Sequence, residues 1–277
     1  MVALYRSPSY SPNQHRCNDT AIMDAVVARL AALGWAVQGA GEADVEAGRI
    51  PAADHYLNMC QGPRASERLV AADLGDAVVV NRPGAVLNCH RHRLVPAMVR
   101  AGIPFPATLL LPTDAVLTAP LDTVSTGNDA PIWIKRGDVH AETREDVIAA
   151  RPAQVAAAIR GFAARGVKTV ALQAHVPGPI VKFYGVTGGR FFHWYLSDNP
   201  LGEGRAGVDG DRLAALAFAA ADALGLHVFG GDAALPSPTE PVLVDINDWP
   251  SFAPVRDAAA DAIAAYVHHL SLNGRIA

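Results

Sequence analysis

Two short apolar runs near the C-terminal end of the chain are each followed by oxygen-bearing side chains. The first run precedes Asp232, and the second precedes Asp245, Ile246 and Asn247. Apolar runs of this length are typical of buried β-strands. Side chains alternate between the two faces of a strand. We therefore expect Asp245 and Asn247 to share one face while Ile246 enters the core.

These oxygen-bearing side chains predict a magnesium site. If Asp232 lies on the strand next to Asp245 and Asn247, the three side chains converge on one spot. Mg²⁺ prefers oxygen ligands and is commonly held by one or two carboxylates together with nucleotide phosphates. The alternative is that each residue caps a turn, which is a common role for a single Asp. Three such residues on adjacent predicted strands favour the metal site.

The composition excludes several classes of protein. The 277 residues are 51% hydrophobic and carry a net charge of −4, so nothing in the charge favours a nucleic-acid partner. Three scattered cysteines without CxxC spacing are typical of free thiols in a reducing compartment. No stretch is apolar and long enough to span a bilayer. We expect a cytoplasmic protein with no membrane partner.

Strands alternate with helices through about residue 80, which predicts a small parallel-sheet lobe. A helix is expected from 91 to 101, followed by an extended segment that contains two prolines. Further strands at 131–135 and 170–173, and a hairpin over 180–195, predict additional sheets. Three lobes are therefore predicted, with residues 1–86, 87–177 and 178–277.

Two lysines stand out because lysine is scarce in this chain. Lys135 ends an apolar strand beside the turn at Gly137, where a cation and loop amides can hold phosphate oxygens. Lys182 lies inside a strand fit for burial and there needs a charged partner, unless it reaches solvent at an edge. The segment from Gln173 through His175 and Val176 leaves a strand at a Pro-Gly turn, and its free backbone groups could contact an adenine edge.

Taken in order, these segments resemble the ATP-grasp superfamily. The resemblance covers about residues 80–255 and rests on six motifs, which are Asn88 with Arg91 and 102–108, 133–135, 172–176, 180–184, 224–232 and 244–252. The nearest branches are the RimK and glutathione synthetase-like ligases and the inositol trisphosphate 5/6-kinases. The implied fold class is mixed α/β and α+β, with a parallel-sheet N-terminal lobe and a nucleotide held between two α+β lobes.

The resemblance also implies roles for individual residues, with ATP and Mg²⁺ as cofactors. Arg91 and Lys135 match the two cations that hold phosphate, and Gln173, His175 and Val176 match the adenine contacts. The metal ligands correspond to Asp232, Asp245 and Asn247, and Lys182 matches a position that faces phosphate or substrate. Arg190 is a candidate anchor for a substrate carboxylate.

The leading hypothesis is an ATP-dependent carboxylate–amine or carboxylate–thiol ligase that acts through an acyl phosphate on a small molecule or peptide. The alternative is a kinase of polyols or inositol phosphates, because Asp245-Ile-Asn247 has Asp where ligases usually have Glu. A third reading is an ATP-binding protein without turnover, because the loop after Lys135 has a single glycine. The resemblance also makes a homodimer plausible.

Overall fold

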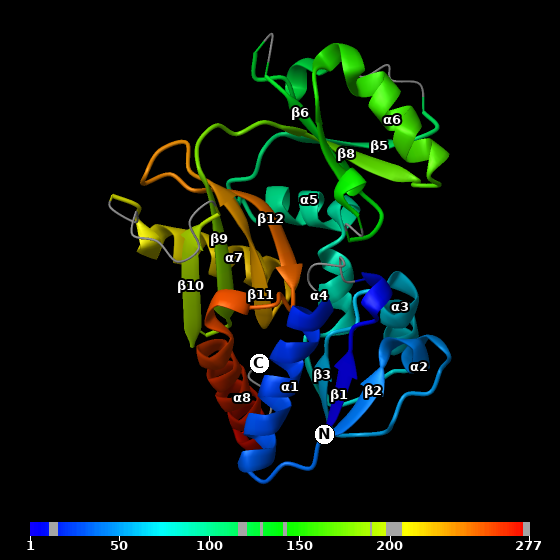
Figure 1. Cartoon of the computed structure of the whole chain (residues 1–277), viewed down its shortest axis with the longest axis vertical. Helices are drawn as coiled ribbons and strands as arrows, with labels where there is room; N and C mark the ends of the chain where they lie inside the picture. Colours follow the sequence, from blue (N-terminus) through cyan, green and yellow to red (C-terminus); the bar gives the residue numbers. More distant parts are fainter. Residues whose placement is uncertain are drawn as a thin grey trace.

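The described part of the chain forms three four-stranded sheets that are arranged around a common centre (Figure 1). The computed structural model describes residues 1–10, 16–115, 121–127, 130–140, 143–188, 190–197 and 207–273. One sheet is parallel and two are antiparallel, which confirms the predicted mixed α/β class.

The N-terminal sheet is parallel and has the order β2-β1-β3-β4. Its strands are β1 (Val2–Tyr5), β2 (Gln38–Gly41), β3 (His55–Asn58) and β4 (Val78–Val80). Apolar side chains of β1, β3 and β4 pack with α2 (Glu42–Glu46) and α3 (Pro63–Ala71) on one side. On the other side they pack with α1 (Arg16–Ala32).

The central sheet is antiparallel and has the order β5-β8-β6-β7. Its strands are β5 (Thr108–Pro112), β6 (Ile132–Arg136), β7 (Val147–Ala150) and β8 (Thr169–Ala174). Helix α6 (Val155–Ala164) covers one face, where Ile132 and Ile134 are fully buried. Trp133 and Lys135 alternate to the opposite face.

The C-terminal sheet is antiparallel and has the order β10-β9-β11-β12. Its strands are β9 (Ile180–Val186), β10 (Phe191–Leu196), β11 (Val228–Ala234) and β12 (Val242–Asp248). One face packs against a helical layer formed by α4 (Pro83–Asn88), α5 (Arg91–Arg100) and α7 (Gly210–Leu224). The other face carries the candidate site.

The last helix ties the N-terminal and C-terminal parts together. Helix α8 (Arg256–Asn273) lies beside α1, and their apolar side chains share a core with residues of β9, β10 and β11 (Figure 1). Likewise α5, which falls within the predicted central lobe, packs on α7 and the C-terminal sheet. The lobe boundaries near 86 and 177 therefore remain predictions. None of the helices in the described part of the chain is both long and apolar enough to cross a membrane.

Candidate functional site

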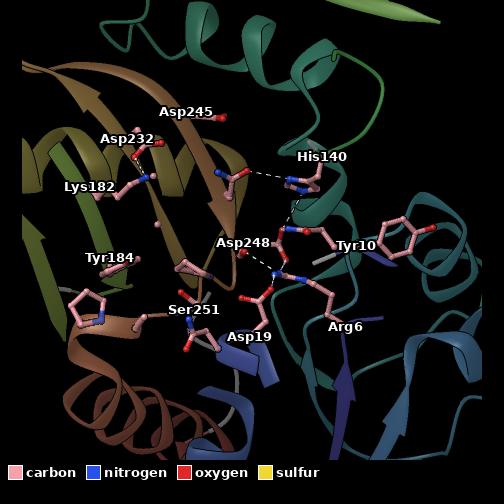
Figure 2. Close-up of a pocket in the computed structure, with 18 of the residues that line it drawn as sticks. Arg6, Tyr10, Asp19, His140, Lys182, Tyr184, Asp232, Asp245, Asp248 and Ser251 are labelled. Carbon is pink, nitrogen blue, oxygen red and sulfur yellow. Dashed lines mark hydrogen bonds and ion pairs between the residues drawn. The ribbon is translucent and has the colours of Figure 1, made fainter. Parts of the chain in front are cut away.

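A cavity of about 510 Å³ lies against the C-terminal sheet, opposite the helical layer (Figure 2). One wall is the sheet itself, and the other walls come from the N-terminal lobe, the loop after β6 and the segment after β12. The polar side chains that line the cavity include Arg6, Asp19, Gln61, Arg91, His140, Lys182, Asp232, Asp245, Asn247 and Asp248. The cavity thus gathers cations, carboxylates and amides from segments that are distant in sequence.

The two strands that carry the predicted metal ligands are neighbours, which is the condition on which the predicted site depends. Asp232 on β11 pairs directly with Asp245 on β12 and, on its other side, with Lys182 on β9. Lys182 in turn pairs with Tyr195 on β10. Directly opposed residues of antiparallel strands project from the same face. The four side chains therefore form one row across the sheet.

A second row brings the amide of the predicted site to the same face. Asn247 pairs with Gly230, which pairs with Tyr184, while Ile246 is fully buried on the other face. A Cβ atom on Gly230 would lie 2.7 Å from Cγ of Pro250 and 2.9 Å from Cδ1 of Tyr184. Only glycine fits between these side chains without displacement, and it leaves Asn247 facing the cavity.

Both predicted metal-binding carboxylates are paired with cations. Nζ of Lys182 lies 2.8 Å from Oδ1 of Asp232, and Nη2 of Arg91 lies 2.6 Å from Oδ2 of Asp245. Burial opposes ionisation of Asp245, but the charges of Arg91 and Lys135 outweigh it and hold its pKa below the usual value. Carboxylate and amide oxygens on paired rigid strands fit the ligand chemistry of Mg²⁺. A bound metal ion would share the carboxylate oxygens with Arg91 and Lys182, or would displace these two side chains from them.

Lys135 links the central sheet to this site. Its side chain is buried, and its Nζ donates to the carbonyl oxygen of Val244, 3.2 Å away, directly before Asp245. Burial, and secondarily the positive charge of Arg91, lower the pKa of Lys135 to about 8, although Asp245 acts in the opposite direction. Arg91 also donates to the carbonyl oxygen of Arg136 at the end of β6. The two predicted phosphate-binding cations therefore meet at Asp245.

The predicted adenine-binding residues lie at the end of β8, where the chain passes between the two antiparallel sheets. Gln173 is buried and pairs with Trp133 on β6, on the same face as Lys135. The Trp133 indole donates to Nδ1 of His175 over 3.2 Å. His175 and Val176 are partly exposed, and none of the three predicted residues lines the cavity. Their adenine-binding role remains a prediction.

Arg190 lies away from the cavity. It is next to the turn that joins β9 and β10, and its guanidinium stands 5.5 Å from the centre of the Tyr266 ring on α8. The last paired residues before that turn, Val186 and Phe191, lie four residue pairs along the hairpin from Lys182 and Tyr195. Arg190 is not among the residues that line the cavity, and its role as a carboxylate anchor remains a prediction.

Five residues that line the cavity were not predicted from the sequence, and together they are called the cavity floor: Arg6, Asp19, Gln61, His140 and Asp248. Asp248 is buried at the end of β12, where it accepts a hydrogen bond from Nε2 of Gln61 and lies 3.7 Å from Nη2 of Arg6. Arg6 also pairs with Asp19 on α1 over 3.2 Å. His140 contacts both Asn247 and Asp248. The only sequence signal was a second Asp directly after the metal motif.

A row of cations and oxygen ligands between an antiparallel sheet and a second lobe defines a candidate nucleotide-binding site. No protein-family model matches the chain, and no curated protein does so by sequence.

Solved structures do match it. The D-alanine–D-alanine ligase from Bacillus anthracis in complex with ATP matches with a TM-score of 0.66 and 10% identity, over 99% of both chains. D-alanyl-alanine synthetase A from Vibrio cholerae O1 biovar eltor matches with a TM-score of 0.68 and 12% identity, also over 99% of both chains. An ATP-grasp RimK domain protein from Sphaerobacter thermophilus DSM 20745 matches with a TM-score of 0.67 and 21% identity, over 96% of this chain and 99% of that one. The chain has the ATP-grasp fold, as its motifs predict.

Proposed function

We propose that the protein is an ATP-dependent ligase that joins a carboxylate to an amine or thiol through an acyl phosphate. The observation that carries the proposal is the row of Lys182, Asp232 and Asp245 on one sheet face, beside Lys135 and Arg91. Cations and oxygen ligands in this arrangement suit a nucleotide triphosphate with its metal. The structural neighbours include a ligase crystallised with ATP, which supports the same class of reaction.

Each group of the row has a role in this reaction. Asp232, Asp245 and Asn247 would hold Mg²⁺, which supplies charge neutralisation at the β- and γ-phosphates. Lys135 and Arg91 would hold phosphate oxygens, because both present buried donors beside Asp245. Lys182 would face the transferred phosphoryl group or the acceptor, since its ammonium points into the cavity (Figure 2).

The chemistry has two steps. A carboxylate oxygen of the acceptor attacks the γ-phosphorus, the bond to the β-phosphate oxygen breaks, and ADP leaves. The amine or thiol then attacks the acyl carbon, loses its proton, and phosphate leaves. An acyl phosphate is susceptible to hydrolysis, so the site must exclude water. The cavity floor of Arg6, Asp19 and Asp248 would face the acceptor, a small molecule or peptide.

A kinase is the second candidate, and the Asp at position 245 favours it. The cavity lining nevertheless has Asp19, Asp232, Asp245 and Asp248 against the cations Arg6, Arg91 and Lys182. Such a balanced set offers less attraction to a polyphosphate than a cluster of cations would. The ligase remains the preferred function. The division of the chain into lobes 1–86, 87–177 and 178–277 is likewise a proposal.

Product analysis separates the two functions. The protein is incubated with Mg²⁺, ATP and three pools, of carboxylic acids, of amines and thiols, and of polyols and inositol phosphates, with each pool also omitted in turn. A ligase releases ADP and inorganic phosphate in equal amounts only when the acid pool and the amine and thiol pool are both present. A kinase yields ADP and a phosphorylated product without free phosphate. ATP binding without ADP formation in any mixture would contradict both functions and favour a non-catalytic protein.

A further inference from the structure

A second group of potential metal ligands lies directly beside the oxygen ligands and differs from them in chemistry. Cys89 directly follows α4, His140 follows β6, and Asp248 ends β12. One sulfur, one ring nitrogen and one carboxylate oxygen from these residues lie within 4.8 Å of one another. All three side chains are buried. Three segments of the chain thus converge on one small, buried volume.

The histidine of this cluster has a ring nitrogen without a hydrogen-bond partner. Nδ1 of His140 lies 3.1 Å from the side-chain oxygen of Asn247, so this nitrogen carries the proton and donates it. In the neutral ring, Nε2 then carries a lone pair. Nε2 is buried, forms no hydrogen bond within the described residues, and lies 3.3 Å from Oδ1 of Asp248. Two acceptors that face each other require a cation between them, or a second proton on the ring.

The neighbours of the cluster hold its members in place. Gln61 donates to Asp248 Oδ1 over 3.2 Å, and Arg6 lies 3.7 Å from the other carboxylate oxygen. His90 packs edge-on against His140, with ring centres 5.2 Å apart. Outer groups of this kind orient metal ligands.

We propose that Cys89, His140 and Asp248 form a site for a soft divalent cation of the Zn²⁺ class, distinct from the oxygen site at Asp232, Asp245 and Asn247. Thiolate, imidazole and carboxylate are the ligand types of Zn²⁺, whereas Mg²⁺ avoids sulfur. Binding deprotonates the Cys89 thiol and releases that proton to solvent. The ion would join α4, the loop after β6 and β12, and so fix the central sheet against the C-terminal sheet.

Three protein ligands leave a fourth position on a tetrahedral ion. His140 and Asp248 line the cavity, whereas Cys89 lies behind them in the core of the C-terminal sheet. The fourth position therefore faces the cavity, where water or a donor atom of the acceptor would complete the coordination.

Cobalt is a direct probe of this site, because a thiolate ligand gives Co²⁺ an intense near-ultraviolet charge-transfer band. The protein is reduced, stripped of metal with a chelator and titrated anaerobically with Co²⁺, and then with Zn²⁺. We expect the thiolate band to appear with about one Co²⁺ per chain and to disappear when Zn²⁺ displaces it. Co²⁺ that binds without the band, or not at all, would overturn the proposal.

Variants assign the band to its ligands. Cys89→Ser should abolish it, whereas Cys60→Ser, which changes an equally buried thiol, and Cys17→Ser should keep it. Asp245→Asn, which alters only the oxygen site, should also keep it. A band that is lost with Cys60→Ser or Cys17→Ser would refute the assignment. If Cys89→Ser does not fold, retention of the band in both other cysteine variants still assigns it to Cys89, because the chain has only three cysteines.

Discussion

At the scale of single residues, Lys182 shows how a charged side chain is kept ionised inside a sheet. Burial opposes its charge, but the charge of Asp232 and its 2.8 Å hydrogen bond outweigh burial and raise the pKa of Lys182. The sequence predicted that this lysine needs a charged partner, and the partner is the neighbouring Asp232. Lys182 therefore remains a cation at neutral pH.

Replacing Lys182 by methionine should lower kcat/KM for ADP formation by about 10²-fold, because a positioned charge at the transferred phosphoryl group is lost. Lys182→Arg should retain much of the activity. Lys168→Met, which removes an exposed lysine, serves as the control. Initial rates of ADP release measure the effect, and equal rates in the two methionine variants would contradict the role of Lys182.

Glu42 is a second residue whose setting makes a specific prediction. Its carboxylate accepts hydrogen bonds from the backbone N–H groups of Ser7, Gln61 and Gly62, at 2.6 to 2.8 Å. Burial nevertheless raises the pKa of Glu42 above its usual value, although these bonds and Arg6 act in the opposite direction. Glu42 thus joins the loop at Ser7 to the loop at Gln61 and Gly62, and burial makes its ionisation less favourable than in water.

The pKa of Glu42 is higher in the folded chain than in the unfolded chain, so folding favours the protonated form. Its contribution to stability is therefore greatest below the unfolded pKa and is lost as the pH rises through the folded pKa. Relative to Glu42→Gln, the free energy of unfolding of the unmodified protein should fall as the pH rises above about 4, the usual pKa of an unfolded glutamate, and through the raised folded pKa. Urea unfolding at several pH values tests this, with Glu67→Gln, a change at an exposed residue of α3, as the control. A difference that stays constant or grows with pH would argue against it.

At the scale of elements, the pairing of β11 with β9 and β12 depends on Gly230. Gly230→Ala should destabilise the protein by about 1–3 kcal/mol, because the added methyl group meets Pro250, Tyr184 and the Phe183 carbonyl oxygen. Gly161 on α6 has open space around it, so Gly161→Ala should be neutral or stabilising by up to about 1 kcal/mol. Thermal unfolding of both variants measures the contrast. Equal melting temperatures would show that the sheet accommodates the methyl group.

The sequence predicted helices and strands best where the pattern of apolar residues agrees with residues that typically begin or end such an element. The pairing of Asp232 with Asp245 followed from two apolar runs and is confirmed. The apolar segment from Trp35 to Val37 has the local character of a strand, but β2 begins only at Gln38, and the Trp35 ring instead packs edge-on against His55 while its indole donates to Nδ1 of His268 on α8. These contacts of Trp35 join residues that are distant in the sequence, so the local sequence does not reveal them.

Helix α4 was missed for a local reason. The sequence around Pro83 and Gly84 reads as a connector, but proline is well tolerated in the first turn of a helix. The cavity floor was missed for a different reason. Arg6, Asp19, Gln61, His140 and Asp248 come from separate segments, and only the packing of three sheets brings them together. The spacing of these residues along the sequence therefore does not predict that they lie together.

At the scale of the whole molecule, the site exists because the central sheet is held against the C-terminal part. Lys135 on β6 donates to Val244 on β12, and Arg91 on α5 contacts both Asp245 and Arg136. The backbone N–H of His92 also donates to the carbonyl oxygen of Gly137. Lys135 and Arg91 link the central sheet to the C-terminal sheet and are also the cations proposed to hold phosphate. Nucleotide binding should therefore be coupled to the approach of these two sheets.

The central claim is that the Asp232, Asp245 and Asn247 set holds the metal of Mg·ATP. Calorimetric titration with a non-hydrolysable ATP analogue, with and without Mg²⁺, tests it most directly in wild type, Asp245→Asn and the exposed control Asp257→Asn. We expect Mg²⁺ to tighten binding to wild type and to the control. Asp245→Asn should weaken the Mg²⁺-dependent binding about 100-fold, or about 2.7 kcal/mol. Equal, Mg²⁺-independent affinity in all three proteins would contradict the claim.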